Sequence, residues 1–293
     1  MLGDLTVQRM GLGAMRLASA HSGVPGDRAR AIGVLRRAVE LGVNHIDTAA
    51  FYFSPSGSAN ELINSALAPY PDDLVITTKV WPGRDPSGEW YWAEPAQLRG
   101  QVEENLRQLG RDHLDVVNLR IPGSAEGASI AGHFAALADL RAAGLIRHLG
   151  LSGISAEQLA EAQAIAPVVC VQNRYGLEAP AADHALLDLC GTHGIAFVPF
   201  FAIAGPAAGR GGAAPSDETV LAIARAHHAT PAQVRLAWTL HRGPHVLAIP
   251  GTGDPAHLTE NIAAAALRLS PQQISSLAAT PLPSSPDPST PAK

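Results

Sequence analysis

Three charged side chains each stand at the end of a short apolar run, where they could act together. Asp47, Lys79 and Arg120 are the last residues of runs rich in Val, Ile and Leu, which is typical of buried strands. If these strands are parallel, their carboxyl ends share one edge and the three side chains converge there. Charges gathered at one edge are what acid–base and electrostatic catalysis requires. A structural ion network is the alternative, but buried charges are costly and tend to mark functional sites.

Eight apolar runs of this kind alternate with longer amphipathic segments along the chain. The predicted strands are Gln8–Leu12, Val43–Asp47, Leu74–Lys79, Val116–Arg120, His148–Ser152, Val168–Gln172, Ala196–Pro199 and Val246–Pro250. The predicted helices are Asp27–Leu41, Asn60–Leu67, Pro95–Leu109, Ile130–Ala143, Ala156–Ala164, Ala182–Thr192, Asp217–His227 and Pro231–Leu240. This alternation predicts an α/β fold, a (β/α)8 TIM barrel, whose active sites lie at the carboxyl ends of the strands. An open doubly wound sheet is the alternative, but it often carries a Gly-x-Gly-x-x-Gly turn that this sequence lacks.

The alternation of side chains along the strands supports this placement of the charged residues. In the run that ends at Arg120, Val117 and Leu119 share one face, while Asn118 and Arg120 share the other. Apolar residues suit the side that faces the helices, and polar residues suit the barrel interior near its mouth. The same alternation turns Lys79 inward at the end of its own run.

The composition limits the classes of protein to which the chain can belong. It has 293 residues, of which 46% are hydrophobic and 16% charged, so it can bury a large core. The formal charge is −5 and no basic stripe stands out, which argues against nucleic acid as a partner. No run of about 18 residues is apolar enough to predict a membrane span, and the first residues lack a signal-peptide pattern. Cys170 and Cys190 cannot form a disulfide framework, so we expect a cytoplasmic protein.

The regions around the barrel carry separate expectations. We expect a single barrel domain over residues 1–280, with a short hairpin in residues 1–10 that covers the bottom. Residues 281–293 are rich in proline and serine and predict a disordered tail. We predict no metal site, because Gly243 and Pro244 interrupt the one candidate pair of histidines.

Aromatic residues are concentrated after the third predicted strand. Trp81, Trp90 and Trp92 are three of the four tryptophans, and all lie within residues 81–94. This segment should hang over the mouth of the barrel, where its rings could form a flat apolar wall for a substrate. The alternative is a loop that packs only on its own barrel.

A series of motifs, each at the end of a predicted strand, resembles the aldo-keto reductase superfamily. The motifs are Gly11–Met15, His45–Ala49 with Tyr52, Thr77–Val80, Leu114–Arg120, Gly150–Ser152, Val171–Tyr175, and Ile249–Thr252 with His257–Asn261. The resemblance covers about residues 8–279. Each motif alone is weak evidence for the superfamily, but the occurrence of all of them in this order along the chain is specific for it. Within the superfamily, the sequence is most similar to bacterial pyridoxal reductases.

This resemblance implies an NADPH-dependent enzyme that reduces an aldehyde to an alcohol, with pyridoxal to pyridoxine as the most specific expectation. It implies that Tyr52 is the proton donor, that Lys79 lowers the pKa of its phenol, and that Asp47 keeps Lys79 charged and oriented. The partner is then a small-molecule carbonyl compound. The alternatives are a broad-range carbonyl or methylglyoxal reductase, and a regulatory subunit that binds NADPH and turns over slowly.

Arg120 departs from the family pattern, because most of the superfamily has a catalytic histidine at this position. Arginine cannot shuttle a proton near neutral pH, but it can donate hydrogen bonds to a developing oxyanion. Our hypothesis is that Arg120 polarises the carbonyl or binds a polar ring substituent, while Tyr52 alone handles the proton.

The resemblance also implies which residues bind the cofactor. Ser152 and Gln172 match residues that bind the nicotinamide carboxamide, and Tyr175 matches an aromatic ring that stacks on the nicotinamide. The other implied cofactor-binding residues are Pro199, Phe200, Arg210, Gly251, Thr252, His257, Glu260 and Asn261. Two positions depart from the pattern: Gly153 stands where Asn is common, and Gly251 stands where many relatives have Lys or Arg. Gly251 therefore predicts weaker binding of the 2′-phosphate of the cofactor.

Overall fold

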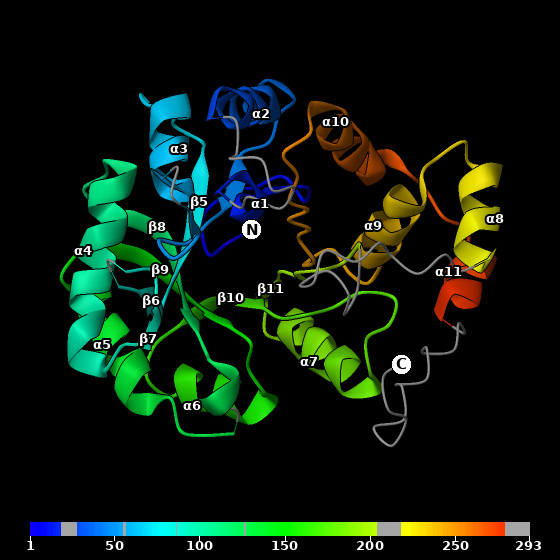
Figure 1. Cartoon of the computed structure of the whole chain (residues 1–293). Coiled ribbons are helices and arrows are strands. Elements are labelled where there is room, and N and C mark those ends of the chain that lie inside the picture. Colours follow the sequence, from blue (N-terminus) through cyan, green and yellow to red (C-terminus); the bar gives the residue numbers. More distant parts are fainter. Residues whose placement is uncertain (19–27, 55–56, 86, 126, 204–217, 279–293) are drawn as a thin grey trace, which may run out of the picture.

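The computed structural model describes residues 1–18, 28–54, 57–85, 87–125, 127–203 and 218–278. Within these ranges, strands form one curved sheet with helices packed around it (Figure 1). In spatial order the strands are β1 (Leu12–Gly13), β2 (His45–Asp47), β5 (Val75–Val80), β8 (Leu114–Arg120), β9 (Ile146–Ser152), β10 (Val168–Gln172) and β11 (Ala196–Phe197). Spatial order follows chain order and every neighbouring pair is parallel, as in a (β/α)8 barrel.

Each predicted helix is present, with ends that differ from the prediction by a few residues. The helices are α2 (Arg28–Glu40), α3 (Ala59–Leu67), α4 (Leu98–Leu109), α5 (Ala131–Ala142), α6 (Ala156–Gln163), α7 (Ala181–Thr192), α8 (Glu218–Ala226) and α9 (Pro231–His241). Capping boxes explain three of the first residues. The side chains of Ser58, Ser155 and Thr230 each accept from the N–H three residues later, where a Glu or Gln accepts from the capping residue's own N–H.

The eighth predicted strand closes the ring through short bridges. Ala248 is bridged in parallel to Met10, and its N–H donates to the carbonyl of Arg9 (2.8 Å). On the other side, the N–H of Leu247 donates to the carbonyl of Phe197 in β11 (2.9 Å). The structure therefore confirms the TIM barrel, with an eighth strand that is shorter than predicted.

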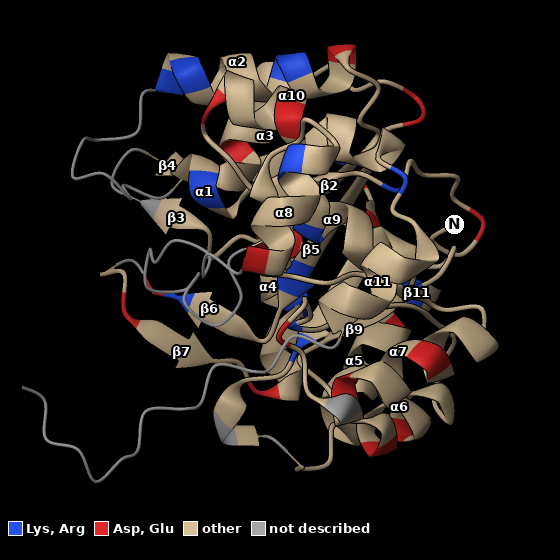
Figure 2. Cartoon of the chain, turned by 90° about the vertical axis from the view of Figure 1, so that its right-hand side faces the viewer, with Lys and Arg blue, Asp and Glu red and all other residues tan. Residues whose placement is uncertain are grey.

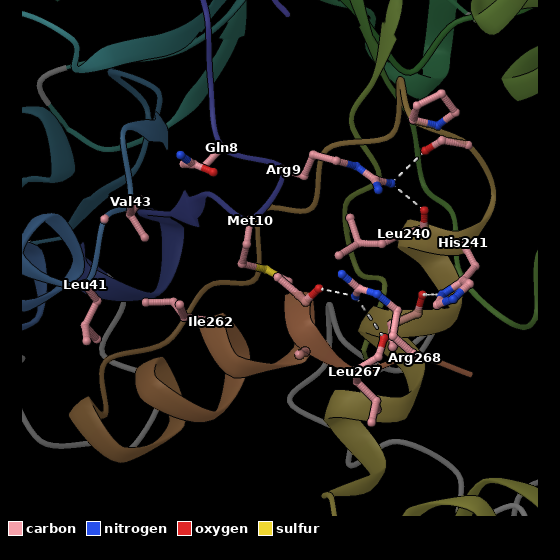
Figure 3. Close-up of a pocket in the computed structure, with 16 residues that line it drawn as sticks. Gln8, Arg9, Met10, Leu41, Val43, Leu240, His241, Ile262, Leu267 and Arg268 are labelled. Carbon is pink, nitrogen blue, oxygen red and sulfur yellow. Dashed lines mark hydrogen bonds between the residues drawn. The ribbon is translucent and has the colours of Figure 1, made fainter. Parts of the chain in front are cut away.

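Arg9 fastens this last strand to the end of α9. Its guanidinium donates to the carbonyls of Val246 (3.1 Å), Gly243 (2.7 Å) and Leu240. Figure 3 shows Arg9 in the wall of a cavity of about 730 Å³, together with Arg268, which donates to backbone carbonyls of its own segment. Both arginines therefore have a structural role at the amino-terminal end of the barrel.

The amino-terminal segment covers the bottom of the barrel, as expected. Leu2 and Leu5 form an antiparallel bridge, and Leu2 is fully buried against interior residues such as Val116. Asp4 in the turn pairs with Arg147 (2.7 Å) at the start of β9. These contacts close the end of the barrel opposite the predicted site.

Several short elements were not predicted from the sequence. They are α1 (Met15–Ala18), α10 (Pro255–Ala263), α11 (Pro271–Ala278), the hairpin of β3 (Phe53–Ser54) with β4 (Gly57–Ser58), and the hairpin of β6 (Pro82–Arg84) with β7 (Trp90–Trp92). The two hairpins project from the same side of the molecule (Figure 2). They add aromatic residues to the rim of the barrel.

Some expectations fall outside the described residues. These are the tail at 281–293, the domain boundary at residue 280, and Arg210. No helix in the described part of the chain is both long and apolar enough to cross a membrane. Within the same ranges, no three His, Cys, Asp or Glu side chains come together as metal ligands would.

Candidate active site

The carboxyl ends of five neighbouring strands bring polar side chains into the barrel interior. Asp47 ends β2, Lys79 lies near the end of β5, and Arg120, Ser152 and Gln172 end β8, β9 and β10. Figure 2 shows a basic position beside the label of β5, separate from those on the outer helices, and Lys79 is the one basic residue of this strand. The convergence expected from strand parity is therefore present.

Lys79 and Asp47 form a buried ion pair. The ammonium Nζ lies 2.6 Å from Asp47 Oδ2 and also donates to the carbonyl of Thr48 (3.0 Å). Gln172 Nε2 donates to the other carboxylate oxygen, Asp47 Oδ1 (2.7 Å). Burial alone would lower the pKa of Lys79, but Asp47 and Tyr52 outweigh it, so the pKa lies above its usual value. Lys79 is therefore a fixed, fully charged group.

Tyr52 lies in the loop after β2, with its ring beside this ammonium group. Lys79 Nζ is 4.8 Å from the centre of the Tyr52 ring, and Phe51 packs edge-on against the same ring. Burial raises the pKa of the Tyr52 phenol, and the charge of Lys79 opposes this effect only in part. The net shift is upward, so the expectation of a lowered pKa is wrong for the structure as it stands. The physical reason is that the free-energy cost of removing the phenolate from water exceeds its electrostatic stabilisation by Lys79.

Arg120 is joined to the ion pair by a chain of polar contacts. Its Nη1 donates to Ser152 Oγ (3.1 Å), and Ser152 Oγ donates to Gln172 Oε1 (3.4 Å). The guanidinium also lies over the ring of Phe200, 5.0 Å from its centre. Burial lowers the pKa of Arg120 below its usual value, yet a guanidinium stays charged near neutral pH.

These side chains open into a cavity of about 1000 Å³ at the carboxyl end of the barrel. The cavity has more basic than acidic side chains, which suits a ligand that carries phosphate groups. The predicted site residues that line it are Asp47, Tyr52, Lys79, Trp90, Trp92, Arg120, Ser152, Gln172, Pro199, Phe200, Gly251, Thr252, His257, Glu260 and Asn261.

Of the predicted site residues that the structure describes, two do not line this cavity. Trp81 is buried and stacks on His133, with ring centres 3.9 Å apart. Tyr175 is also buried, and its hydroxyl lies 2.6 Å from Nδ1 of His184. Trp81 therefore anchors the hairpin instead of facing the cavity, whereas the predicted Phe200 does line it.

Other residues that were not predicted from the sequence also line the cavity. Arg16 on α1 and Arg174 after β10 add positive charge, and Phe51 and Phe201 add aromatic surface. A sequence signal existed for the two arginines. Arg16 directly follows the first motif, and Arg174 lies inside the motif that contains Gln172.

The β6–β7 hairpin gives the cavity an exposed aromatic rim. Trp90 and Trp92 are 49% and 50% exposed, and their rings stack with centres 6.0 Å apart. Phe51 lies 5.7 Å from Trp90, and the guanidinium of Arg84 covers the same indole at 4.0 Å. Exposed rings at the mouth of a cavity suit a flat apolar ligand.

Comparison with known proteins agrees with this geometry. The sequence model of the aldo/keto reductase family matches residues 9–280. The chain belongs to the aldo/keto reductase family. It is therefore an oxidoreductase, as the resemblance of its motifs implied.

Curated relatives and solved structures agree with this assignment. The pyridoxine 4-dehydrogenase of Escherichia coli (strain K12) is 47% identical over 94% of this chain and 96% of its own length. A thermostable aldo-keto reductase solved with the inhibitor epalrestat is 28% identical over 95% of this chain and 97% of its own, with a TM-score of 0.79. An aldo/keto reductase from Klebsiella pneumoniae, solved with NADP and acetate, is 28% identical over 92% and 90%, with a TM-score of 0.75.

Proposed function

We propose that this enzyme uses NADPH to reduce an aldehyde to an alcohol, and that pyridoxal, reduced to pyridoxine, is its substrate. The observation that carries the substrate is the 47% identity to a pyridoxine 4-dehydrogenase over almost the full length of both chains. The exposed Trp90 and Trp92 at the cavity mouth support a flat ring over a small dicarbonyl. Cys170 and Cys190 are free, buried thiols, which supports the proposed cytoplasmic location.

The cofactor end of the cavity fits a dinucleotide phosphate. A Cβ on Gly13 would lie 2.7 Å from the carbonyl oxygen of Ile249, and one on Gly251 would lie 2.8 Å from that of Gly13. Both positions therefore need glycine, so a basic side chain cannot stand at residue 251 without separating these backbones. Arg16 runs beside Gly251 and supplies a cation to this end of the cavity. We assign the 2′-phosphate to Arg16, with Thr252 as a hydroxyl donor.

The nicotinamide end is assigned to the polar residues near the ion pair. Ser152 and Gln172 carry the hydroxyl and amide groups that a carboxamide can bind, and Phe200 offers an aromatic face. The residues assigned to the adenosine end are His257, Glu260 and Asn261, on the side of α10 that lines the cavity. When bound, NADPH supplies the hydride.

Tyr52 is the proposed proton donor to the carbonyl oxygen of the substrate. Its raised pKa keeps the phenol protonated at neutral pH, which is the state that a donor requires. The ammonium of Lys79 stabilises the phenolate that remains after the proton has left. The carboxylate of Asp47 holds Lys79 in place, and Gln172 in turn donates a hydrogen bond to that carboxylate. Arg120 lines the same cavity and is the proposed hydrogen-bond donor to the substrate.

Oxidation of NADPH by purified protein, with pyridoxal as the only carbonyl compound, tests this proposal. We expect steady turnover in the wild type and a loss of about 100-fold to 10,000-fold in Tyr52→Phe, since that variant lacks the acidic hydroxyl. Tyr70→Phe is a matched control, because Tyr70 donates to the carbonyl of Leu109 away from the cavity.

The other candidate functions predict different outcomes. Turnover of methylglyoxal with none of pyridoxal would replace the substrate by small dicarbonyls. Tight binding of NADPH with no turnover of any aldehyde would contradict the enzymatic proposal and favour a regulatory subunit.

A further inference from the structure

Gly153 and Arg120 occupy the same small space at the end of β8 and β9. A Cβ on Gly153 would lie 2.8 Å from Arg120 Nη1 and 3.4 Å from its Cζ. The backbone of Gly153 has a φ of 74°, which favours glycine for a second reason. The side chain of Asn173 fixes this turn, because its Oδ1 accepts from the N–H groups of Gly153 (2.9 Å) and Ile154 (3.0 Å). The departures from the family pattern at Arg120 and at Gly153 are therefore physically linked, because the missing side chain of Gly153 leaves room for the guanidinium.

In this position the guanidinium of Arg120 has no carboxylate partner among the described residues. Its contacts there are Ser152 Oγ on one edge and the ring of Phe200 on one face. Asp47 already binds Lys79 and Gln172, and Arg174 adds a second positive charge nearby. A half-buried cation that faces a ligand cavity without an acidic partner is suited to binding an anion.

We propose that Arg120, seated in the space that Gly153 leaves, binds an anionic oxygen on the substrate ring directly beside the aldehyde. The substrate class is then an aromatic aldehyde with an ionised hydroxyl in the ortho position. An ortho oxygen lies close to the carbonyl oxygen on the same side of the ring. Arg120 can therefore donate to the ortho oxygen while Tyr52 donates to the carbonyl oxygen. This inference rests on the proposed function and deepens it, since pyridoxal carries such a hydroxyl.

Two simple aldehydes test the inference. The probes are 2-hydroxybenzaldehyde and 4-hydroxybenzaldehyde, compared at a pH above both phenol pKa values, so that both carry the same charge and differ only in its position. We expect the wild type to prefer the ortho compound by about 10-fold to 100-fold in kcat/KM, the range for a hydrogen bond to a charged group. In Arg120→Gln the rates change for both compounds, but their ratio falls to about one, mainly through the KM of the ortho compound.

Gly153→Ala tests the space itself. The new methyl group displaces the guanidinium, so this variant is also expected to lose the ortho preference. Adding Gly153→Ala to Arg120→Gln should cause no further loss of preference, because the two changes act on one contact. Gly144→Ala is the matched control: Gly144 has a similar φ of 80° but no atom within 4 Å of the added Cβ, so it keeps the preference.

The outcomes separate the inference from the function on which it rests. An equal loss on both aldehydes in Arg120→Gln would show that Arg120 acts on the carbonyl itself, which overturns the inference. A wild type that reduces pyridoxal but does not distinguish the two probes would also overturn it, while leaving the proposed function intact. A wild type that reduces no aldehyde would refute the proposed function.

Discussion

At the scale of single residues, the site depends on the balance between burial and charge around one phenol. Tyr52 is partly buried, which favours its neutral form, and Lys79 beside it favours the phenolate. The buried ion pair with Asp47 prevents Lys79 from losing its own charge. The result is a donor that holds its proton at neutral pH but has a cation in place when the proton leaves.

The raised pKa of Tyr52 predicts an unusual pH profile. Reduction needs the protonated phenol, and the pKa of this group lies above its ordinary value of 10.0. We therefore expect kcat/KM for reduction to stay flat from about pH 7 to about pH 10 and to fall only above that range. Oxidation of the alcohol needs the phenolate, so kcat/KM for oxidation should rise from about pH 7 to about pH 10, where kcat/KM for reduction stays flat. A descending limb for reduction centred below about pH 9 would contradict the assignment.

The division of roles between Tyr52 and Arg120 predicts unequal effects of substitution. Arg120→His keeps a hydrogen-bond donor near the carbonyl and leaves Tyr52 in place, so on unsubstituted benzaldehyde it should lose less than about tenfold in kcat. Tyr52→Phe should lose at least about 100-fold on the same substrate. Stopped-flow measurement of NADPH oxidation compares the chemical steps of the two variants. Losses of the same size in both variants would contradict this division of roles.

At the scale of elements, the β6–β7 hairpin positions aromatic rings over the cavity, and Trp81 positions the hairpin. Trp81 has a φ of 96°, a strained conformation for this residue, where the chain turns out of β5. Both its N–H and its carbonyl bind the side chain of Gln101, and its ring stacks on His133. The tryptophans that look equivalent in the sequence therefore have different roles.

Substitution of these tryptophans should separate binding from stability. Trp90→Ala and Trp92→Ala remove exposed rings, so the KM for an aromatic aldehyde should rise about tenfold with little change in unfolding free energy. Trp81→Ala leaves a cavity in the core and should lower the unfolding free energy by about 3–5 kcal/mol. Urea unfolding and steady-state kinetics on the same preparations measure both effects. If Trp90→Ala were as destabilising as Trp81→Ala, the hairpin would be part of the core instead of a substrate wall.

The short helix α1 predicts how the enzyme selects its cofactor. Arg16 lies beside Gly251, where no basic side chain can stand, so it should carry the recognition of the 2′-phosphate. Arg16→Gln should raise the Kd for NADPH about tenfold or more, while the Kd for NADH changes little. Fluorescence titration with both cofactors measures the difference, with Arg99→Gln on the exposed face of α4 as control. An equal weakening of both cofactors would assign Arg16 to the shared part of the dinucleotide.

At the scale of the whole molecule, the sequence predicted the barrel because its strands and helices differ in period and length. Short elements carried no such signal: β3 and β4 have two residues each, and α1 has four. Asp47, Lys79 and Arg120 could be predicted as a cluster from strand parity alone. The space for Arg120 could not, because it depends on the pairing of Arg120 with Ser152 across β8 and β9 and on the backbone angle of Gly153.

The barrel interior also makes the stability of the whole molecule depend on pH through His45. This residue lies on β2 two positions before Asp47, fully enclosed, with Nε2 3.3 Å from Thr77 Oγ1 and Nδ1 without a partner in the described structure. Burial lowers the pKa of His45 from 6.5 to about 4, although Asp47 opposes the shift; Lys79 and the terminal amino group add to it. Between pH 6.5 and about pH 4, His45 is therefore protonated in the unfolded chain but neutral in the folded chain. Acidification over this interval favours unfolding.

The expected loss is about 3 kcal/mol of unfolding free energy as the pH falls from 6.5 to about 4, with no contribution from this group above that range. His45→Gln keeps an amide within reach of Thr77 but cannot titrate, so its stability should fall less steeply over the same interval. Urea unfolding of both proteins at several pH values gives the two slopes. Parallel pH dependence in the two proteins would show that the pKa of His45 does not differ between the folded and the unfolded chain, which contradicts this prediction.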